Sequence, residues 1–495
     1  ALQSGNMADA KQEELTKGWK HILTDQFHDI IPGSSIHEVY EDSRKDYAYI
    51  EGVAREVERS AYAHITEKKE HTYTVINPSG WTMNQIVEIP GDVDGRFQDK
   101  DGNELISQKG QGVTYVEVKD VPPMGMKVIS IGQTEKSSEK AGAFTIEDRE
   151  IETPYYRISL NQYGQITRLY DKTYARDVLP EGERANVLQV FEDKPLDFDA
   201  WDIDIFYQEK MREITDLTIF EVAEIGPLRM RLHMEWDFAP GMKKSDGPSS
   251  CIKQDMLLYS NDRRIDFKTE VDFHEQHKLL KAAFPVDIRS TYGTYDVQYG
   301  NVRRPNNWNT SWEQAKFETV AHRWADLSER NYGVSILNDC KYGHDIKDNV
   351  LRISLLRAGT HPDHLQDQGI HTFTYALLPH KGDFVEGMVV QEAFALNEPM
   401  QAVAGQSSLS FDSFLSFDNE QVELDAVKKS EDGKYIVVRF HEFAGSKQEV
   451  TVKPGFSYHA WAKCDLRERP VTEFSRDEIR MQLHAYEIKT LLIEV

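Results

Sequence analysis

The sequence predicts a mainly β protein in which an N-terminal helical hairpin precedes several antiparallel β-sandwich domains. Over about the first 65 residues, apolar positions recur every three or four residues, the period of an amphipathic helix. Beyond residue 70, short segments of alternating polarity are separated by turn residues, as in β-strands. Aromatic residues are abundant (22 Tyr, 22 Phe and 8 Trp) and favour sheets with large cores. Because helical patterns do not separate these strands, antiparallel sandwiches are favoured over βαβ units.

The predicted hairpin consists of two helices. The apolar stripe of the first helix runs along residues 15–30, and Pro32-Gly33 is expected to end that helix. Ser35 and Glu38 have the spacing of a capping box, which predicts a second helix over about 36–66. Two amphipathic helices need a third surface to bury both stripes, so the hairpin is expected to be part of a three-helix bundle whose partner helix lies upstream of Ala1.

The positions of polar linkers and turn-rich segments along the chain predict four domains. These are a partial helical bundle at 1–69, a small β-sandwich at 70–135, a large β-sandwich at 143–400 and a C-terminal β-sandwich at 401–495. The polar stretch 133–142 reads as a linker, and 399–408 as a second one. A hairpin is expected where strands at 155–160 and 165–170 flank a turn at 161–164.

The net charge and the cysteine content of the chain bear on its partners and on its cellular location. The formal net charge is −25, which disfavours nucleic acid and anionic membranes as partners. No segment is long and apolar enough to predict a transmembrane helix. Cys251, Cys340 and Cys464 lie far apart and form no disulfide framework, which favours a cytoplasmic location. The start at Ala1, without an initiator Met or a signal peptide, suggests a fragment or a processed product.

The segment QFHDIIPGSS at 26–35 carries the strongest chemical signal. A His-Asp pair, His28 and Asp29, is expected in the last turn of the first helix, where a carboxylate opposes the helix dipole. From the residue types alone, a solvated helix end is the simpler interpretation. One His-Asp pair also cannot form a zinc site, which needs three or four ligands.

This segment resembles the Gln-x-His-Asp-x-x-x-Gly-[Ser/Thr] signature of the α-mannosidases of glycoside hydrolase family 38. Further blocks are similar to the cytosolic and bacterial branch of that family and follow in the family's order. They are AWDID at 200–204, VDFHE and KLLK at 271–281, QYG at 298–300, FE at 317–318, HRWADLS at 322–328, LNDCKYG at 337–343, LLR at 355–357 and DQGIH at 367–371.

The resemblance implies the C-terminal portion of a zinc-dependent, retaining α-mannosidase that lacks the N-terminal α/β catalytic domain. It implies that His28 is the single zinc ligand present, that Asp29 hydrogen-bonds the sugar and that Tyr295 contacts it. No catalytic residue is expected in this chain, because the family's His-x-Asp-x-Ala-Trp block is absent. The implied large sandwich is a galactose-mutarotase-like supersandwich, and the implied partners are an α-mannoside oligosaccharide or small mannoside and further copies of the full-length enzyme.

Other interpretations remain open from the sequence. The chain could be a non-catalytic carbohydrate-binding or scaffolding protein built of β-sandwiches, or an unrelated β-rich adhesin. HEQH at 274–277 is one residue short of the HExxH zinc motif and follows a strand pattern, which argues against a metalloprotease. The aromatic cluster at 292–312 could stack on sugars, although core packing is the simpler explanation for most of its members.

Overall fold

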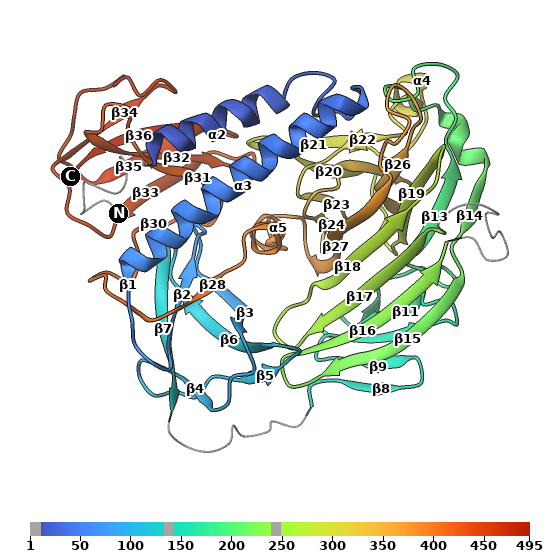
Figure 1. Cartoon of the computed structure of the whole chain (residues 1–495), viewed down its shortest axis with the longest axis horizontal. Coiled ribbons are helices and arrows are strands. Elements are labelled where there is room, and N and C mark those ends of the chain that lie inside the picture. Colours follow the sequence, from blue (N-terminus) through green and yellow to red (C-terminus); the bar gives the residue numbers. More distant parts are fainter. Residues whose placement is uncertain (1–10, 133–141, 239–248) are drawn as a thin grey trace.

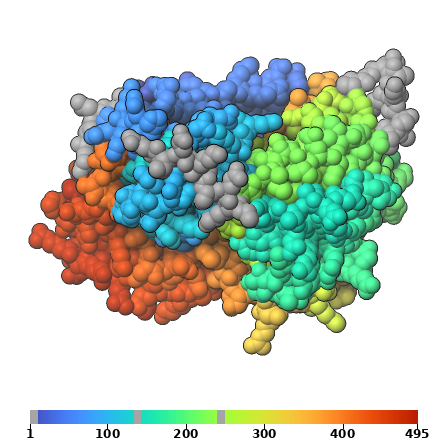
Figure 2. All heavy atoms as spheres, turned by 90° about the horizontal axis from the view of Figure 1, so that it is seen from below, coloured from blue at the N-terminus to red at the C-terminus, as the bar shows by residue number. Residues whose placement is uncertain are grey.

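The computed structural model describes residues 11–132, 142–238 and 249–495, and it confirms a mainly β protein with a helical hairpin at its start (Figure 1). A small sandwich, a large sandwich and a C-terminal sandwich follow the hairpin, and they adjoin one another in the space-filling view (Figure 2). The first linker, predicted at 133–142, lies almost wholly outside the described residues.

The hairpin consists of α2 (Gln12–Asp25) and α3 (His37–Ile65), which run antiparallel. Lys11 pairs with Glu56 at 2.7 Å and His21 with Asp46 at 2.9 Å. The predicted second helix is confirmed, but the first helix ends earlier than expected, because the Phe27 amide binds the Thr24 carbonyl and tightens the turn. Within the described ranges, no helix has both the length and the apolar character needed to cross a membrane.

The predicted capping box is wrong. Ile36 is the N-cap residue of α3, and no side chain caps the helix. The Ser35 amide instead donates to the Tyr40 hydroxyl oxygen at 2.6 Å, and that hydroxyl donates to the Asp29 carbonyl at 3.0 Å. The serine therefore belongs to the turn between the helices, and its amide is already bound there.

The small sandwich combines a four-stranded sheet, in the order β28-β2-β7-β4, with a three-stranded sheet, in the order β3-β6-β5. Its strands are β2 (Thr72–Asn77), β3 (Met83–Pro90), β4 (Arg96–Asp99), β5 (Ser107–Lys109), β6 (Val113–Val121), β7 (Gly125–Gly132) and β28 (Gln401–Ala404). A further pair joins β1 (Thr66–Glu67) to β29 (Gln406–Ser407). The stretch predicted as a second linker is therefore strand, because its backbone completes sheets that begin more than 300 residues earlier.

The large sandwich holds a nine-stranded sheet, a six-stranded sheet and a five-stranded sheet around one core. Phe267 and Phe284, from the nine- and six-stranded sheets, pack with their rings 5.9 Å apart. The predicted hairpin is confirmed as β10 (Tyr156–Leu160) and β11 (Ile166–Asp171).

The nine-stranded sheet contains β15 (Asp216–Ile225), β16 (Arg229–Asp237), β17 (Cys251–Tyr259), β18 (Ile265–Phe273), β20 (Tyr292–Val297), β21 (Gly300–Pro305), β23 (Trp324–Ser328), β24 (Tyr332–Asn338) and β27 (Gly369–Lys381). The six-stranded sheet contains β13 (Val187–Glu192), β14 (Met211–Glu213), β19 (Lys278–Pro285), β22 (Thr319–Val320), β25 (Gly343–Lys347) and β26 (Val350–Ala358). The five-stranded sheet contains β8 (Thr145–Glu147), β9 (Glu150–Glu152), β10 (Tyr156–Leu160), β11 (Ile166–Asp171) and β12 (Arg176–Asp177).

Three short helical elements interrupt the strands: η1 (Ile205–Glu209), α4 (Ser311–Gln314) and α5 (Val389–Asn397). Helix α5 was not expected from the sequence, because four of its nine residues are buried and its apolar pattern does not mark one face. It packs its buried side onto β24 and β23 and lies where the three sandwiches meet (Figure 1).

The C-terminal sandwich packs a three-stranded sheet, β30-β33-β35, on a four-stranded sheet, β31-β32-β36-β34. Its strands are β30 (Leu415–Phe417), β31 (Val422–Lys429), β32 (Tyr435–Glu442), β33 (Gln448–Pro454), β34 (Ala460–Cys464), β35 (Ile479–Leu483) and β36 (Ile488–Glu494).

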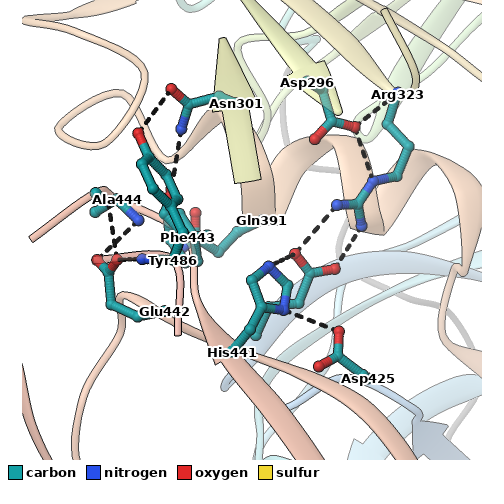
Figure 3. Close-up of polar contacts among 12 residues, drawn as sticks. Asp296, Asn301, Arg323, Gln391, Asp425, His441, Glu442, Phe443, Ala444 and Tyr486 are labelled. Carbon is teal, nitrogen blue, oxygen red and sulfur yellow. Dashed lines mark hydrogen bonds and ion pairs between the residues drawn. The ribbon is translucent and has the colours of Figure 1, made fainter. Parts of the chain in front are cut away.

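Arg323 joins the C-terminal sandwich to the large sandwich (Figure 3). Its guanidinium binds Glu423 through two hydrogen bonds of 2.6 and 3.1 Å and also binds Asp296 at 3.3 Å. Both carboxylates are buried. Beside this group, Tyr486 donates to Asn301, which donates to the Phe443 carbonyl. The junction is therefore fixed by charged hydrogen bonds as well as by apolar contact.

We expect Arg323→Met to lower the free energy of unfolding by about 3–5 kcal/mol, because it leaves two buried carboxylates without their cation. Urea unfolding followed by circular dichroism measures this change. Arg480→Met is the matched control, since Arg480 pairs with Glu449 in an exposed position and its loss is expected to cost about 0–1 kcal/mol. Equal, small effects of both substitutions would show that the Arg323 contacts contribute little.

Candidate functional site

The turn between α2 and α3 forms the centre of the candidate site. Main-chain hydrogen bonds from Ile30 and Ile31 to Phe27, and from Gly33 to Ile30, close successive tight turns after α2 ends. Asp29 adopts a left-handed backbone conformation with φ of 67°. Aspartate tolerates this region better than most residues, because its short side chain can hydrogen-bond locally. The His-Asp pair thus lies in a turn and not in the last helical turn, so the predicted conflict with the helix dipole is wrong.

The Asp29 carboxylate is held from both sides through one oxygen. Its Oδ1 accepts hydrogen bonds from Ser34 Oγ at 2.9 Å and from Trp201 Nε1 at 3.0 Å. Its Oδ2 accepts no hydrogen bond from the rest of the described chain. The carboxylate is therefore oriented by the protein and keeps one oxygen available as an acceptor.

Trp201 reaches Asp29 from a loop that the large sandwich anchors. Asp199 accepts hydrogen bonds from the Thr360 amide and from Thr360 Oγ1, the latter at 3.0 Å. On the other side of Trp201, Arg357 binds the Asp202 carbonyl and holds Asp193 at 2.6 Å. Two segments about 160 residues apart thus fix the indole that positions Asp29.

Two further contacts tie the hairpin to the large sandwich. The His37 ring lies 3.2 Å from both carboxylate oxygens of the buried Asp363. Gln366 donates to the Gly33 carbonyl at 3.3 Å. These contacts fix the position of the turn at 26–35 relative to the β-domains. A functional group carried on a loop needs such support to keep its geometry.

His28 has the opposite environment to Asp29. Its ring is exposed and lies against the neighbouring Phe27 ring, with centroids 4.1 Å apart. Among the described residues it makes no hydrogen bond and no ion pair. An imidazole that projects from an ordered turn without an internal partner is free to bind a metal or a ligand.

The segments that contribute to the site, α2, the turn after it and the loop of Trp201, carry large exposed apolar side chains: Trp19, Leu23, Phe27, Ile31, Leu196, Phe198 and Trp201. A groove of about 450 Å³ is lined by Lys20, Leu23, Thr24, Phe27 and Ile30. Monomeric proteins seldom leave so much apolar surface uncovered next to polar groups. The surface around His28 and Asp29 therefore has the composition of an interface.

The structure places Tyr295 apart from this surface. Tyr295 lies in β20 and is 2% exposed within the core of the large sandwich. Its ring lies under the Arg304 guanidinium, 4.5 Å from centroid to charge centre. Tyr295 can therefore contact a sugar only if this packing rearranges, whereas Tyr292 and Tyr299 beside it are exposed.

The described part of the chain contains no group of three or more His, Cys, Asp or Glu side chains arranged to hold a metal ion. His28 can supply one ligand, and Asp29 one acceptor, to a site that other groups complete. Sequence reasoning found both residues but gave no role to Trp201 or Gln366, whose contacts with the turn depend on the tertiary fold.

Three family models match this chain. The model described as "Glycosyl hydrolases family 38 C-terminal domain" matches residues 151–365, and the model of that family's C-terminal beta sandwich domain matches 421–491. The model described as "Alpha mannosidase middle domain" matches 3–65 and so includes His28 and Asp29. Together these matches cover the helical hairpin and most of two sandwiches.

Curated relatives agree with these models. Alpha-mannosidase G of Dictyostelium discoideum is 31% identical over 481 residues, covering 88% of this chain and 43% of that protein. Alpha-mannosidase 2C1 of Homo sapiens is 30% identical over 469 residues, covering 92% of this chain and 43% of that protein. The chain thus spans less than half the length of these relatives. A crystal structure of an alpha-mannosidase from Enterococcus faecalis V583 has a TM-score of 0.80 at 16% identity, covering 97% of this chain and 63% of that one, which shows a shared fold.

Proposed function

Since the chain belongs to glycosyl hydrolase family 38, we propose that it is the C-terminal part of a zinc-dependent, retaining α-mannosidase that hydrolyses terminal α-linked mannose. The observation that supports this most is the exposed, unpartnered His28 beside the oriented Asp29 in the matched middle domain. The proposal extends to oligosaccharide or small α-mannoside substrates, a cytoplasmic location and assembly of the full-length enzyme into homo-oligomers.

The residues of this chain fit a metal site that is shared with another domain. One neutral imidazole provides one of the three or four protein ligands that zinc takes. Within the described residues, the His28 ring makes no hydrogen bond or ion pair that it would have to give up. When bound, zinc supplies a positive charge that polarises and orients sugar hydroxyls. The apolar rim around His28 would be covered by the domain that supplies the remaining ligands, which also excludes water from the site.

Asp29 would bind the sugar directly. Its Oδ1 is held by Ser34 and Trp201, so its orientation is set before a ligand arrives. The open Oδ2 can accept a hydrogen bond from a mannose hydroxyl, a charge-assisted contact that is stronger than one between neutral groups. Because the Asp29 carboxylate is already oriented, it loses less conformational entropy when a sugar binds, and this favours the hydrogen-bonded complex.

A retaining glycosidase needs two carboxyl groups about 5 Å apart, one as the nucleophile and one as the acid and base. We propose that both lie outside these 495 residues. The purified chain is then expected to release no product from an aryl α-mannoside, even with zinc added, because binding groups alone cannot replace the nucleophile. A colorimetric assay at several enzyme concentrations measures this. Turnover that scales with the amount of chain and survives repurification would contradict the proposal.

A further inference from the structure

A cavity of about 600 Å³ opens on the large sandwich beside the loop that carries Trp201. Its apolar lining comes from Ile203, Leu279 and Val320, and its polar lining from Arg304, Lys316, Glu318, Thr319, Ser354 and Arg357. Most of these residues belong to the six-stranded sheet and its connections. The cavity is widely open to solvent, and its volume lies within the range of sites for small organic ligands.

Two of the charged groups in the cavity wall are already neutralised. Glu318 is paired with Lys281, which is completely buried and also holds Asp345 at 2.5 Å. Arg357 holds the buried Asp193 at 2.6 Å. Arg352 also binds Asp345, at 2.7 Å, and so balances the second carboxylate of the Lys281 group. With Arg352 counted, these paired groups carry no net charge.

The other two charged groups, Arg304 and Lys316, have no carboxylate partner among the described residues. The Arg304 guanidinium donates one hydrogen bond, from Nη1 to the Val320 carbonyl at 2.9 Å, and its remaining N–H groups have no acceptor in that part of the chain. Burial lowers the pKa of Arg304, although a guanidinium stays charged at any physiological pH. The cavity thus carries an excess of two positive charges in a chain whose formal net charge is −25.

We propose that this cavity binds a small anionic sugar, one that carries a carboxylate or phosphate group. The planar guanidinium of Arg304 and the ammonium of Lys316 match the anionic group, since arginine binds carboxylate and phosphate through two parallel hydrogen bonds. The apolar wall offers a surface for the sugar ring, and Thr319 and Ser354 offer hydroxyl groups for its polar edge. Local positive charge in an otherwise acidic protein also concentrates anions at this opening. This site depends neither on His28 nor on zinc, so it goes beyond the proposed function.

Isothermal titration of the purified chain tests the proposal with four probes: mannose 6-phosphate, glucuronate, mannose and inorganic phosphate. At least one of the two acidic sugars is expected to bind roughly tenfold more tightly than both mannose and inorganic phosphate, because it alone engages both the cations and the apolar wall. The affinity should fall as salt is raised. No binding of either acidic sugar up to about 10 mM, or equally tight binding of inorganic phosphate, would overturn it.

Substitutions identify the site. Arg304→Gln and Lys316→Gln are each expected to weaken binding of the acidic sugar by roughly tenfold. Lys316 is exposed, so its substitution leaves the fold intact even if Arg304→Gln disturbs the packing against Tyr295. Arg303→Gln is the matched control, because Arg303 is exposed on the same strand and does not line the cavity. An unchanged affinity in Lys316→Gln, or an equal loss in Arg303→Gln, would place the ligand elsewhere. The assay uses neither zinc nor turnover, so its failure is distinguishable from failure of the mannosidase proposal.

Discussion

In the full-length enzyme, His28→Ala is expected to lose bound zinc and to lower kcat/KM for an α-mannoside by at least about a hundredfold. Loss of a group that merely orients a metal ligand already costs about 10–100-fold, so loss of the ligand itself should cost no less. Metal content measured by atomic absorption after dialysis, together with initial rates, checks both parts. Folding should be little affected, because the ring is exposed and lies against Phe27.

His64→Ala is the matched control for this substitution. His64 is also an exposed histidine of the hairpin, but it lies in the last turn of α3, away from the turn that carries His28. The control is expected to keep wild-type zinc content and activity. If His28→Ala behaved like His64→Ala in both measurements, His28 would have no role in metal binding.

Lys281→Met is expected to lower the free energy of unfolding by about 3–5 kcal/mol, a loss as large as that expected for Arg323→Met. The ammonium of Lys281 is completely enclosed between Glu318 and Asp345. Burial lowers the pKa of Lys281, but Asp345 and Glu318, with Tyr207, outweigh it and hold the pKa above its ordinary value. The substitution leaves the buried Glu318 carboxylate without a cation and leaves Asp345 with Arg352 alone, which binds it at 2.7 Å. Urea unfolding near pH 7 measures the cost.

The control for Lys281→Met is Lys268→Met, since Lys268 is exposed on β18 in the same domain. It should change the free energy of unfolding by less than about 0.5 kcal/mol. The loss in Lys281→Met should shrink when Glu318→Gln is added, because the carboxylate that Lys281→Met leaves unpaired is then removed. A double variant as unstable as the sum of both single variants would contradict this account of the cluster.

Local sequence signals predicted local structure well. The turn at 161–164 correctly marked the hairpin of β10 and β11, and the long apolar stripe marked α3. Pairing between distant segments could not be predicted, because β28 reads as a polar linker until β2 is known to lie beside it. The capping box failed for a related reason, since Tyr40 binds the Ser35 amide once the turn is folded.

In the candidate site, too, contacts between distant segments could not be predicted from the sequence. The motif at 26–35 identified His28 and Asp29, yet nothing in it indicates that Trp201 orients the Asp29 carboxylate. The sugar contact of Tyr295 stays a prediction, and its burial in the core could not be inferred from the block that contains it. Residue type and order locate a site, whereas burial and contact decide which side chains can act there.

Anomalous diffraction at the zinc absorption edge, on crystals of the full-length enzyme, measures directly whether His28 binds zinc. We expect a zinc peak about 2.0–2.1 Å from a ring nitrogen of His28, with the other ligands supplied by residues outside this chain. A zinc ion coordinated entirely by other residues, with the His28 ring left in solvent, would contradict it.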